Sequence, residues 1–353
     1  MRQCTRVRKF KNEKLLQPGR DVPVTIKDIA KIAGVSHTTV SRALKGHPAI
    51  STETTERIQD IAQQMGYTPS AVAQSLLARR TMTIGMVVTT IADPFITRVV
   101  EGVESVAQAA SYSVFLATSH NNPDQEIAVV EMLHHRRVDA IIVTASRMGS
   151  LYASQLDKAQ VPIVLINNQE EGEYLHSVTV DDVQGAQLAV EHLISLGHCR
   201  IGYLGVNNRP RSDKRRLTGY QKALKQAGIE FDSALIFHPE ADYTTRGQKG
   251  LPYFLSINAT AIFCYNDLTA IGLIMACKQH NIAVPDQLSV VGFDDIEFST
   301  YVTPPLTTIA QPRLALGQMA MKMALDLLND QDAQDQVLPC QLVVRESTSA
   351  PRH

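Results

Sequence analysis

A cluster of small polar residues and one arginine lies near the start of the sequence. In the stretch "DIAKIAGVSHTTVSRAL", Asp28 to Leu44, only Val40 and Leu44 are strong apolar anchors from His37 onward. The polar positions around these anchors are His37, Thr38, Thr39, Ser41 and Arg42. Hydroxyl groups can bond phosphate oxygens, and arginine can donate two hydrogen bonds to one guanine. These residues indicate a helix face that contacts DNA, and the alternative is the solvated face of a small helical bundle.

A second group of polar residues follows apolar runs that read as strands, or begins the helix after one. Arginine, asparagine and aspartate side chains can bond the hydroxyls of a small molecule, and an aromatic face can pack on a sugar ring. The alternative is that such residues cap the next helix, which we expect of Asp267. The group consists of Asp93, Phe95, Asn167, Arg216, Asn266, Asp267, Asp294 and Asp295.

Enzyme and metal chemistry find little support in the sequence. It has no GxSxG elbow, no GxxxxGK[ST] loop, no HExxH and no GxGxxG. The five cysteines are scattered without a CxxC pair, which is typical of reduced thiols in a cytoplasmic protein. We expect His134 and His135 to be surface residues after a helix, and His192 and His198 to be structural. No catalytic residue, metal or cofactor is therefore predicted.

The elements that would position the first cluster are three short helices. Thr25 followed by Asp28 is a capping-box pattern, so a helix is expected from Ile26, with an apolar stripe of Ile29, Ile32 and Ala33. Gly34 permits a tight turn, and Ser36 can cap a second helix. A third helix is expected after Ser51 or Thr52. Two short helices around a glycine turn, supported by a third, form a helix-turn-helix unit whose second helix enters the major groove.

The elements that would position the second group are parallel strands. Seven continuous apolar runs alternate with helical stretches from Thr83 onward, and this pattern indicates parallel sheets covered on both faces. Their grouping predicts two doubly wound lobes, with a ligand site at the carboxyl ends of the strands. The runs are "TIGMVV", "SVFLAT", "DAIIVTA", "PIVLIN", "RIGYLGV", "AIFCYN" and "LSVVGFDD".

Charge is distributed unevenly along the 353 residues, although the formal net charge is only −1. Residues 1–80 hold 14 Lys and Arg against 6 Asp and Glu, and the remainder holds 20 against 29. A basic N-terminal segment followed by an acidic remainder indicates that the N-terminal segment binds a polyanion. The alternative is a solvated basic tail, because half of these positive charges lie in the first 20 residues. The basic N-terminus lacks the apolar segment of a secretory signal, and no membrane span is expected.

The segment from Val24 to Leu76 closely resembles the LacI/GalR family of bacterial transcriptional regulators, and the similarity continues to about residue 347. The resemblance implies that His37 and Thr38 discriminate between bases, with Arg42 one turn later, while Thr25, Ser36, Thr39 and Ser41 hold the DNA backbone. "SAVAQSLLARR" matches the family's hinge helix, which folds only against cognate DNA. Leu76 matches the leucine that wedges into the minor groove. Gln74 stands where many members have arginine, which puts one phosphate contact in doubt.

The resemblance also implies a fold like that of periplasmic sugar-binding proteins, with a small-molecule effector between the lobes. Arg216, Asn266 and Asp294 match the family's usual effector contacts, and Tyr243 lies near the position of a stacking aromatic. The expected fold is a small all-α helix-turn-helix head plus two doubly wound parallel-sheet α/β lobes. The expected parts are an N-terminal extension (1–22, disordered), a head (23–69), a hinge (70–81) and an effector-binding and dimerisation domain (82–353). Lobe 1 is expected over 82–180 and 312–330, and lobe 2 over 181–311 and 338–348.

The expected function follows from this resemblance. The chain is predicted to be a cytoplasmic transcriptional regulator, a repressor, that is nucleoid-associated when it is bound to a pseudo-palindromic DNA operator. A sugar or related metabolite would control its operator affinity. No leucine heptad tail follows "VVRES", so a homodimer paired through the lobes is expected rather than a tetramer. One alternative is a solute-binding transport protein, which accounts for the two lobes but not for the missing signal peptide or the basic N-terminal segment. The other is a sugar-processing enzyme with a DNA-binding-like appendage, for which no catalytic constellation is visible.

Overall fold

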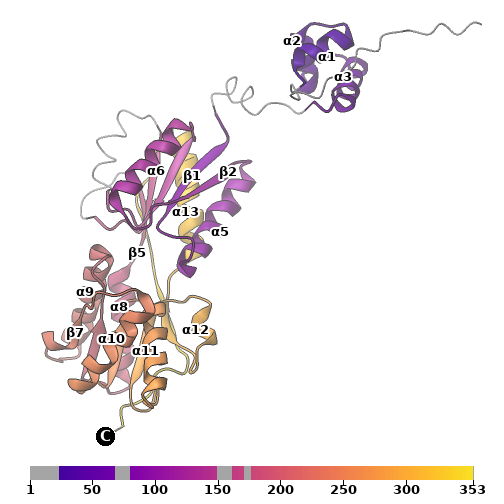
Figure 1. Ribbon diagram of the computed structural model, residues 1–353. Coiled ribbons are helices and arrows are strands. Elements are labelled where there is room, and N and C mark those ends of the chain that lie inside the picture. Colours follow the sequence, from indigo (N-terminus) through magenta and orange to yellow (C-terminus); the bar gives the residue numbers. More distant parts are fainter. Residues whose placement is uncertain (1–23, 68–79, 149–160, 171–175, 353) are drawn as a thin grey trace, which may run out of the picture. The chain divides into compact units, whose positions relative to one another are not determined.

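The computed structural model describes residues 24–67, 80–148, 161–170 and 176–352. The chain forms two compact units, Met1–Ala78 and Arg79–His353. Figure 1 shows a helical N-terminal unit and an α/β C-terminal unit. The predicted fold class is confirmed. Within the described ranges, no helix has both the length and the apolar character needed to cross a membrane.

The described residues of the N-terminal unit form three helices, α1 (Ile26–Ala33), α2 (His37–Leu44) and α3 (Thr52–Gln64). The predicted helix starts are confirmed. The carboxylate of Asp28 accepts hydrogen bonds from the backbone N–H of Thr25 at 2.9 Å and from its hydroxyl at 2.7 Å. Ser36 and Ser51 cap α2 and α3, since their side chains accept from backbone N–H groups three residues later. Gly34 ends α1 in the left-handed region with φ of 68°, which favours glycine.

The core of this unit is small and apolar. Ile29, Val40, Ala43 and Ile58 are completely buried. The expectation that Ile32 faces inward is wrong, because 61% of its surface is exposed. The buried face of α1 is centred on Ile29, Ala30 and Ala33, and a rotation of about 100° per residue carries position 32 past the edge of that face.

Lobe 1 of the C-terminal unit is a parallel sheet of six strands in the order β11-β5-β4-β3-β1-β2. Its strands are β1 (Thr83–Val88), β2 (Ser113–Thr118), β3 (Ala140–Thr144), β4 (Ile163–Ile166), β5 (Ser177–Val180) and β11 (Gln336–Leu338). Its helices are α5 (Pro94–Ala109), α6 (Pro123–His135) and α13 (Arg313–Leu328). Helix α13 lies beside α5, so a late segment of the chain returns to lobe 1 (Figure 1).

Lobe 2 is a second sheet of six strands in the order β12-β10-β9-β8-β6-β7. Its strands are β6 (Ile201–Leu204), β7 (Ile236–Phe237), β8 (Ala261–Cys264), β9 (Ser289–Asp294), β10 (Thr307–Ala310) and β12 (Gln341–Val343). Its helices are α8 (Asp182–Ser195), α9 (Pro210–Gln226), the 3₁₀ turn η1 (Ser233–Leu235), α10 (Tyr243–Ser256), α11 (Asp267–Gln279) and α12 (Phe298–Tyr301). Strand β12 pairs with β10 in the antiparallel sense, whereas the other pairs in this sheet are parallel.

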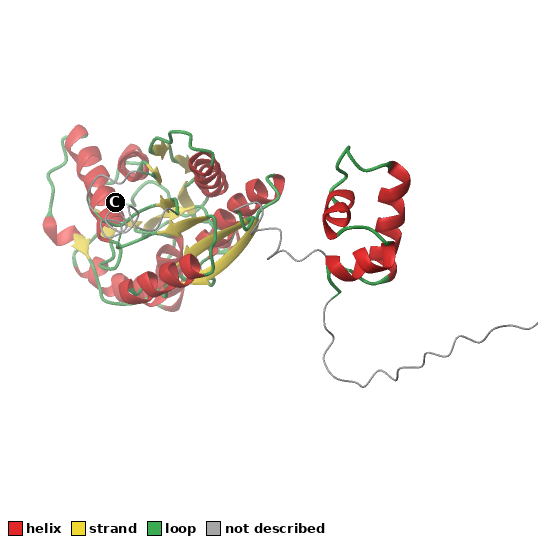
Figure 2. Ribbon diagram, turned by 90° about the horizontal axis from the view of Figure 1, so that it is seen from above, coloured by secondary structure: helices red, strands yellow, loops and turns green. Residues whose placement is uncertain are grey.

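Helices lie on both sides of the strands (Figure 2). The burial pattern explains this, because successive residues of one strand point to opposite faces of its sheet. In β3, Ile142 packs in the core shared with α5 and α13, while Ile141 and Val143 pack in the core shared with α6. Both faces therefore need apolar residues, and the seven predicted runs are confirmed as strands β1, β2, β3, β4, β6, β8 and β9.

Helices α5 and α13 cross at two glycines. A Cβ atom on Gly317 would lie 2.0 Å from the carbonyl oxygen of Val99, and one on Gly102 would lie 2.2 Å from that of Leu314. No side chain fits in that space, so the two helix backbones approach directly. This contact fixes the N-terminus of α5 relative to the segment before α13, and both of these lie at the carboxyl ends of strands.

Two histidine interpretations can be compared with the structure. His198 is buried and its ring nitrogens lie near Thr260 Oγ1, Ser289 Oγ and the Ser349 carbonyl oxygen, at 2.9, 3.1 and 2.8 Å, so it is structural as predicted. His134 and His135 are exposed as predicted, but they form the last turn of α6 rather than following it.

Candidate functional site

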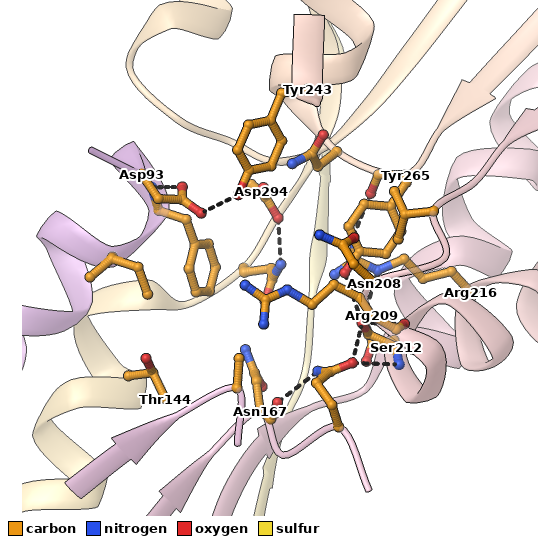
Figure 3. A pocket seen from close by; sticks show the side chains of 18 of the residues that line it. Asp93, Thr144, Asn167, Asn208, Arg209, Ser212, Arg216, Tyr243, Tyr265 and Asp294 are labelled. Atoms are coloured by element: carbon orange, nitrogen blue, oxygen red, sulfur yellow. Dashed lines mark hydrogen bonds and ion pairs between the residues drawn. The ribbon is translucent and has the colours of Figure 1, made fainter. Parts of the chain in front are cut away.

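A pocket lies between the two lobes, where the carboxyl ends of their strands face each other. It opens to solvent, and the empty space between its walls, with the open mouth included, is about 700 Å³. Its lining combines apolar rings and side chains with many polar groups (Figure 3). The residues that line it are Asp93, Phe95, Ile96, Thr144, Ala145, Ile166, Asn167, Gln169, Asp182, Val206, Asn208, Arg209, Ser212, Arg216, Tyr243, Arg246, Tyr265, Asn266, Asp294 and Gln311.

The structure brings together all seven side chains that the sequence proposes for an effector. Asp93, Phe95 and Asn167 come from lobe 1, and Arg216, Tyr243, Asn266 and Asp294 come from lobe 2. Asp295 is not part of the lining, since its carboxylate pairs with Arg345 at 2.5 Å. Several further lining residues were not predicted from the sequence. They include the charged residues Asp182, Arg209 and Arg246 and the aromatic Tyr265.

Arg216 is held rigidly within lobe 2. Its Nε donates to Asp182 Oδ1 at 2.9 Å, and its Nη1 donates to the Tyr265 carbonyl oxygen. The guanidinium lies over the rings of Phe293 and Tyr265, 3.7 and 4.3 Å from their centroids. Burial opposes its charge, but nearby oxygens, including those of Tyr265, Asp182 and Asp294, outweigh this and raise the pKa of Arg216. Arg216 therefore enters the site as a fixed cation.

Asp294 is a buried carboxyl at the end of β9. Gln311 Nε2 donates to its Oδ1 at 2.6 Å. Burial raises its pKa well above the ordinary range, although Arg216 acts in the opposite direction. Its φ of 126° is a strained conformation for a residue with a side chain, and such strain persists where the surroundings impose it. The chain therefore presents this carboxyl at the pocket at some cost in backbone energy.

Asp93 and Tyr243 connect the two lobes across the pocket. Asp93 caps α5, since its Oδ1 accepts from the backbone N–H of Phe95 at 3.0 Å. Its Oδ2 accepts from the hydroxyl of Tyr243, on α10 of lobe 2, at 3.2 Å. A second polar bridge runs from the Ser212 hydroxyl to Gln169 Oε1 at 3.0 Å. The capping and the site interpretations of Asp93 are therefore compatible.

The expectation that Asp267 caps α11 is wrong. Asn266 is the cap, since its Oδ1 accepts from the backbone N–H of Thr269 at 3.1 Å. Asp267 is buried one residue later, where it accepts from the backbone N–H of Ile296 at 2.9 Å and from the Thr308 hydroxyl. Burial raises the pKa of Asp267 to about 6. Asn and Asp are equally good caps, so the sequence did not distinguish the two positions.

The second candidate site is the exposed face of α2 in the N-terminal unit. His37, Thr38 and Arg42 are exposed, and none makes a side-chain hydrogen bond or ion pair with the described residues. The Ser36 and Thr39 hydroxyls lie 2.9 Å apart and stabilise the start of the helix. Ser41 is half-buried, and Thr25 is occupied with Asp28. Gln74 and Leu76 of the predicted hinge lie outside the described residues.

The chain matches two protein-family models. Residues 25–70 match the model of bacterial regulatory proteins of the lacI family, and residues 190–348 match that of a periplasmic binding protein-like domain.

Curated relatives and a solved structure match nearly the whole chain. The HTH-type transcriptional repressor PurR of Mannheimia succiniciproducens is 34% identical over 330 residues, 92% of this chain and 98% of that protein. The HTH-type transcriptional regulator GalR of Escherichia coli is 34% identical over 331 residues, 93% of this chain and 96% of that protein. The crystal structure of the Lac repressor dimer bound to operator and the anti-inducer ONPF gives a TM-score of 0.84 at 29% identity, covering 93% of this chain and 100% of that chain.

These relatives are transcriptional regulators rather than enzymes, and they span both units of the chain. The prediction of a DNA-binding transcriptional regulator without enzymatic activity is therefore confirmed. This chain belongs to the LacI family of bacterial regulatory proteins.

Proposed function

We propose that this regulator binds a pseudo-palindromic operator as a homodimer, and that a small-molecule effector between the lobes controls its operator affinity. The observation that carries the proposal is the free polar face of α2, where His37, Thr38 and Arg42 are exposed without partners among the described residues. In helix-turn-helix proteins the second helix reads base edges from its N-terminal part. One such helix per chain requires two chains to read two half-sites.

Contacts within the N-terminal unit hold α2 in a fixed position, which supports its proposed role in binding DNA. Arg57 of α3 donates to the carbonyl oxygen of Ala33 at the end of α1 at 3.2 Å. Val40 and Ala43 anchor α2 in the core, and they leave the opposite face to solvent. A side chain that needs no rearrangement before it contacts DNA loses less conformational entropy on binding. In this proposal Thr25, Ser36, Thr39 and Ser41 contact the phosphate backbone.

Control by an effector is supported by contacts that cross the pocket. Tyr243 with Asp93 and Ser212 with Gln169 join the lobes directly at the place where a ligand would lie. A ligand that competes with or completes these contacts has different affinities for different lobe arrangements, and it therefore shifts their populations. We propose Asp93, Phe95, Asn167, Arg216, Tyr243, Asn266 and Asp294 as effector contacts, and a sugar or related metabolite as the effector.

The part played by residues 70–81 rests on the sequence alone. In the proposal these residues transmit the lobe arrangement to the head, and Leu76 inserts into the minor groove of the operator. The protein would act in the cytoplasm, on the nucleoid.

Replacing Arg42 by Ala should weaken operator binding by roughly 1–3 kcal/mol if Arg42 contacts a guanine. Two charge-assisted hydrogen bonds to one base would be lost, while the exposed position leaves the fold unaffected. Fluorescence anisotropy titration of an operator duplex at fixed salt measures the change. Arg98→Ala is the matched control, because Arg98 is an exposed arginine of the C-terminal unit that pairs with Glu101 at 2.6 Å. Equal affinities for Arg42→Ala and Arg98→Ala would exclude Arg42 as a base-reading residue.

A further inference from the structure

Three arginines are among the described residues that line the pocket, and within the described part of the chain only one of them pairs with a carboxylate. Arg216 is paired with Asp182 at 2.9 Å. Arg209 and Arg246 form no ion pair with any carboxylate of the described residues. An unpaired buried cation is costly, so such groups in a pocket indicate that the partner comes from outside the chain.

Arg246 is the more buried of the two cations. Only 4% of its surface is exposed, and its Nη2 donates to the carbonyl oxygen of Ala241. Its Nε is buried and has no acceptor among the described residues. Burial lowers the pKa of Arg246, while the phenols of Tyr243 and Tyr265 and the carboxyl groups of Asp242 and Asp213 oppose this effect. The chain thus maintains a guanidinium in the wall of the pocket with part of its hydrogen-bonding capacity unused.

Arg209 extends into the pocket from the residue before α9, as Figure 3 shows. Its Nη2 makes a long contact of 3.4 Å to Thr89 Oγ1 of lobe 1, and its Nη1 is buried without a hydrogen-bond partner in the part of the chain that the structure describes. Arg209 and Arg246 line the pocket together with Tyr243 and Tyr265, and Arg246 lies one helical turn after Tyr243 on α10.

The described carboxylates that line the pocket form no ion pair with Arg209 or Arg246. Asp93 accepts from Phe95 and Tyr243, and Asp294 accepts from Gln311. These acidic and amide groups suit the hydroxyls of a ligand, and the Oε1 atom of Gln311 is a buried acceptor that still lacks a donor. The pocket thus offers acceptors for hydroxyl groups and unpaired guanidinium donors for an anion.

We propose that the effector is an anionic polyhydroxyl compound, a sugar acid or a sugar phosphate, whose anionic group binds Arg209 and Arg246. Guanidinium groups bind carboxylate and phosphate through charge-assisted hydrogen bonds, which are stronger than bonds between neutral groups. A neutral sugar or nucleobase would leave the buried Arg246 and the half-buried Arg209 without an anionic partner among the described residues. This inference rests on the proposed effector pocket and specifies the chemistry of its ligand.

Isothermal titration calorimetry of the full chain with matched compounds tests the proposal. The probes are glucose, gluconate and glucose 6-phosphate, then ribose and ribose 5-phosphate, and inorganic phosphate at millimolar concentration. At least one anionic sugar should bind about tenfold or more tightly than its neutral parent, the effect of one charge-assisted hydrogen bond. Preference for the carboxylate or the phosphate member identifies the source of the anion.

Variants of the two arginines assign the anion to its site. Arg209→Gln and Arg246→Gln should each remove most of the preference for the anionic compound, while Arg209→Lys should keep part of it. Arg215→Gln is the matched control, because Arg215 lies on α9 outside this pocket and pairs with Asp181 at 3.6 Å in an exposed position. Arg209→Gln is decisive if Arg246→Gln lowers stability, since Arg209 is only half-buried.

Three results would overturn the inference. They are equal affinity for neutral and anionic members, an anion preference that survives in both glutamine variants, and no binding of any anionic probe, inorganic phosphate included. These titrations contain no DNA, so their failure leaves operator recognition standing. Conversely, an absence of sequence-specific DNA binding would refute the proposed function without affecting the ligand result.

Discussion

Replacing Arg216 by Met should lower the free energy of unfolding of the C-terminal unit by about 3–5 kcal/mol, the usual cost of breaking a buried ion pair from one side. The substitution leaves Asp182, which is buried at the start of α8, without its cation. It also removes the bond to the Tyr265 carbonyl oxygen and the packing on Phe293. Denaturant unfolding followed by circular dichroism measures the loss.

Two control variants distinguish the effect of breaking the buried ion pair from the effect of removing a positive charge. Arg215→Met, next to it on α9, breaks only the exposed contact with Asp181 and should cost no more than about 1 kcal/mol. Arg216→Met combined with Asp182→Leu should be more stable than Arg216→Met alone, since no buried charge then remains unpaired. If Arg215→Met and Arg216→Met are equally stable, the buried pair does not hold α8 and α9 together.

The loss in the free energy of unfolding that Arg216→Met causes should also depend on pH. Burial already raises the pKa of Asp182, and Arg216 opposes this shift, so removing the cation raises the pKa of the folded state further. A carboxyl group whose pKa is higher in the folded than in the unfolded state stabilises the fold while it is protonated. This stabilisation is lost as the pH rises from the pKa of the unfolded state through the pKa of the folded state. The difference in the free energy of unfolding between Arg216→Met and the parent protein should therefore be smaller at pH 5 than at pH 7.

Replacing Gly317 by Val should destabilise lobe 1 by more than about 3 kcal/mol, because the clash is with backbone that cannot rotate away. The Cβ atom alone would lie 2.0 Å from the Val99 carbonyl oxygen and 2.8 Å from the Val103 nitrogen. Helices α5 and α13 would have to separate, and the separation would move Asp93 and Phe95 at the start of α5. Thermal unfolding and effector affinity should therefore both be impaired.

Lys322→Val is the matched control for Gly317→Val. Lys322 lies on the same helix but is exposed, so this variant carries only the modest cost of a β-branched residue in a helix, below about 1 kcal/mol. A Gly317→Val protein as stable as Lys322→Val would show that the two helices are not packed backbone to backbone.

The sequence predicts most of the elements because their signals are local. Caps at Ser36 and Ser51 and long apolar runs such as "TIGMVV" depend on neighbours in the chain. Strands such as β5 ("SVTV") and β10 ("TTIA") were missed, because they are short and contain hydroxyl residues. Their strand conformation comes from pairing with distant partners, β4 and β9.

The difference between local sequence signals and contacts between distant segments also explains which pocket residues the sequence predicts. Asn167, Asn266 and Asp294 lie at strand ends or directly after them, and parallel topology gathers such positions at one edge of each sheet. Arg209 stands in a loop and Arg246 inside a helix, where charged residues are ordinarily solvated. Only the packing of α9 and α10 reveals that both face the pocket. The orientation of α1 about its own axis, which exposes Ile32, is likewise set by tertiary packing.

The central claim is that α2 reads an inverted-repeat operator from a dimer. Selection of duplexes bound by the full chain from a random-sequence library, followed by anisotropy titration of the selected and scrambled duplexes at one salt concentration, tests it most directly. The account predicts enrichment of a pseudo-palindrome with two chains bound per duplex, and an affinity about 10³-fold or more above that for the scrambled duplex. Enriched sequences without inverted symmetry, or equal affinity for the selected and scrambled duplexes, would contradict it.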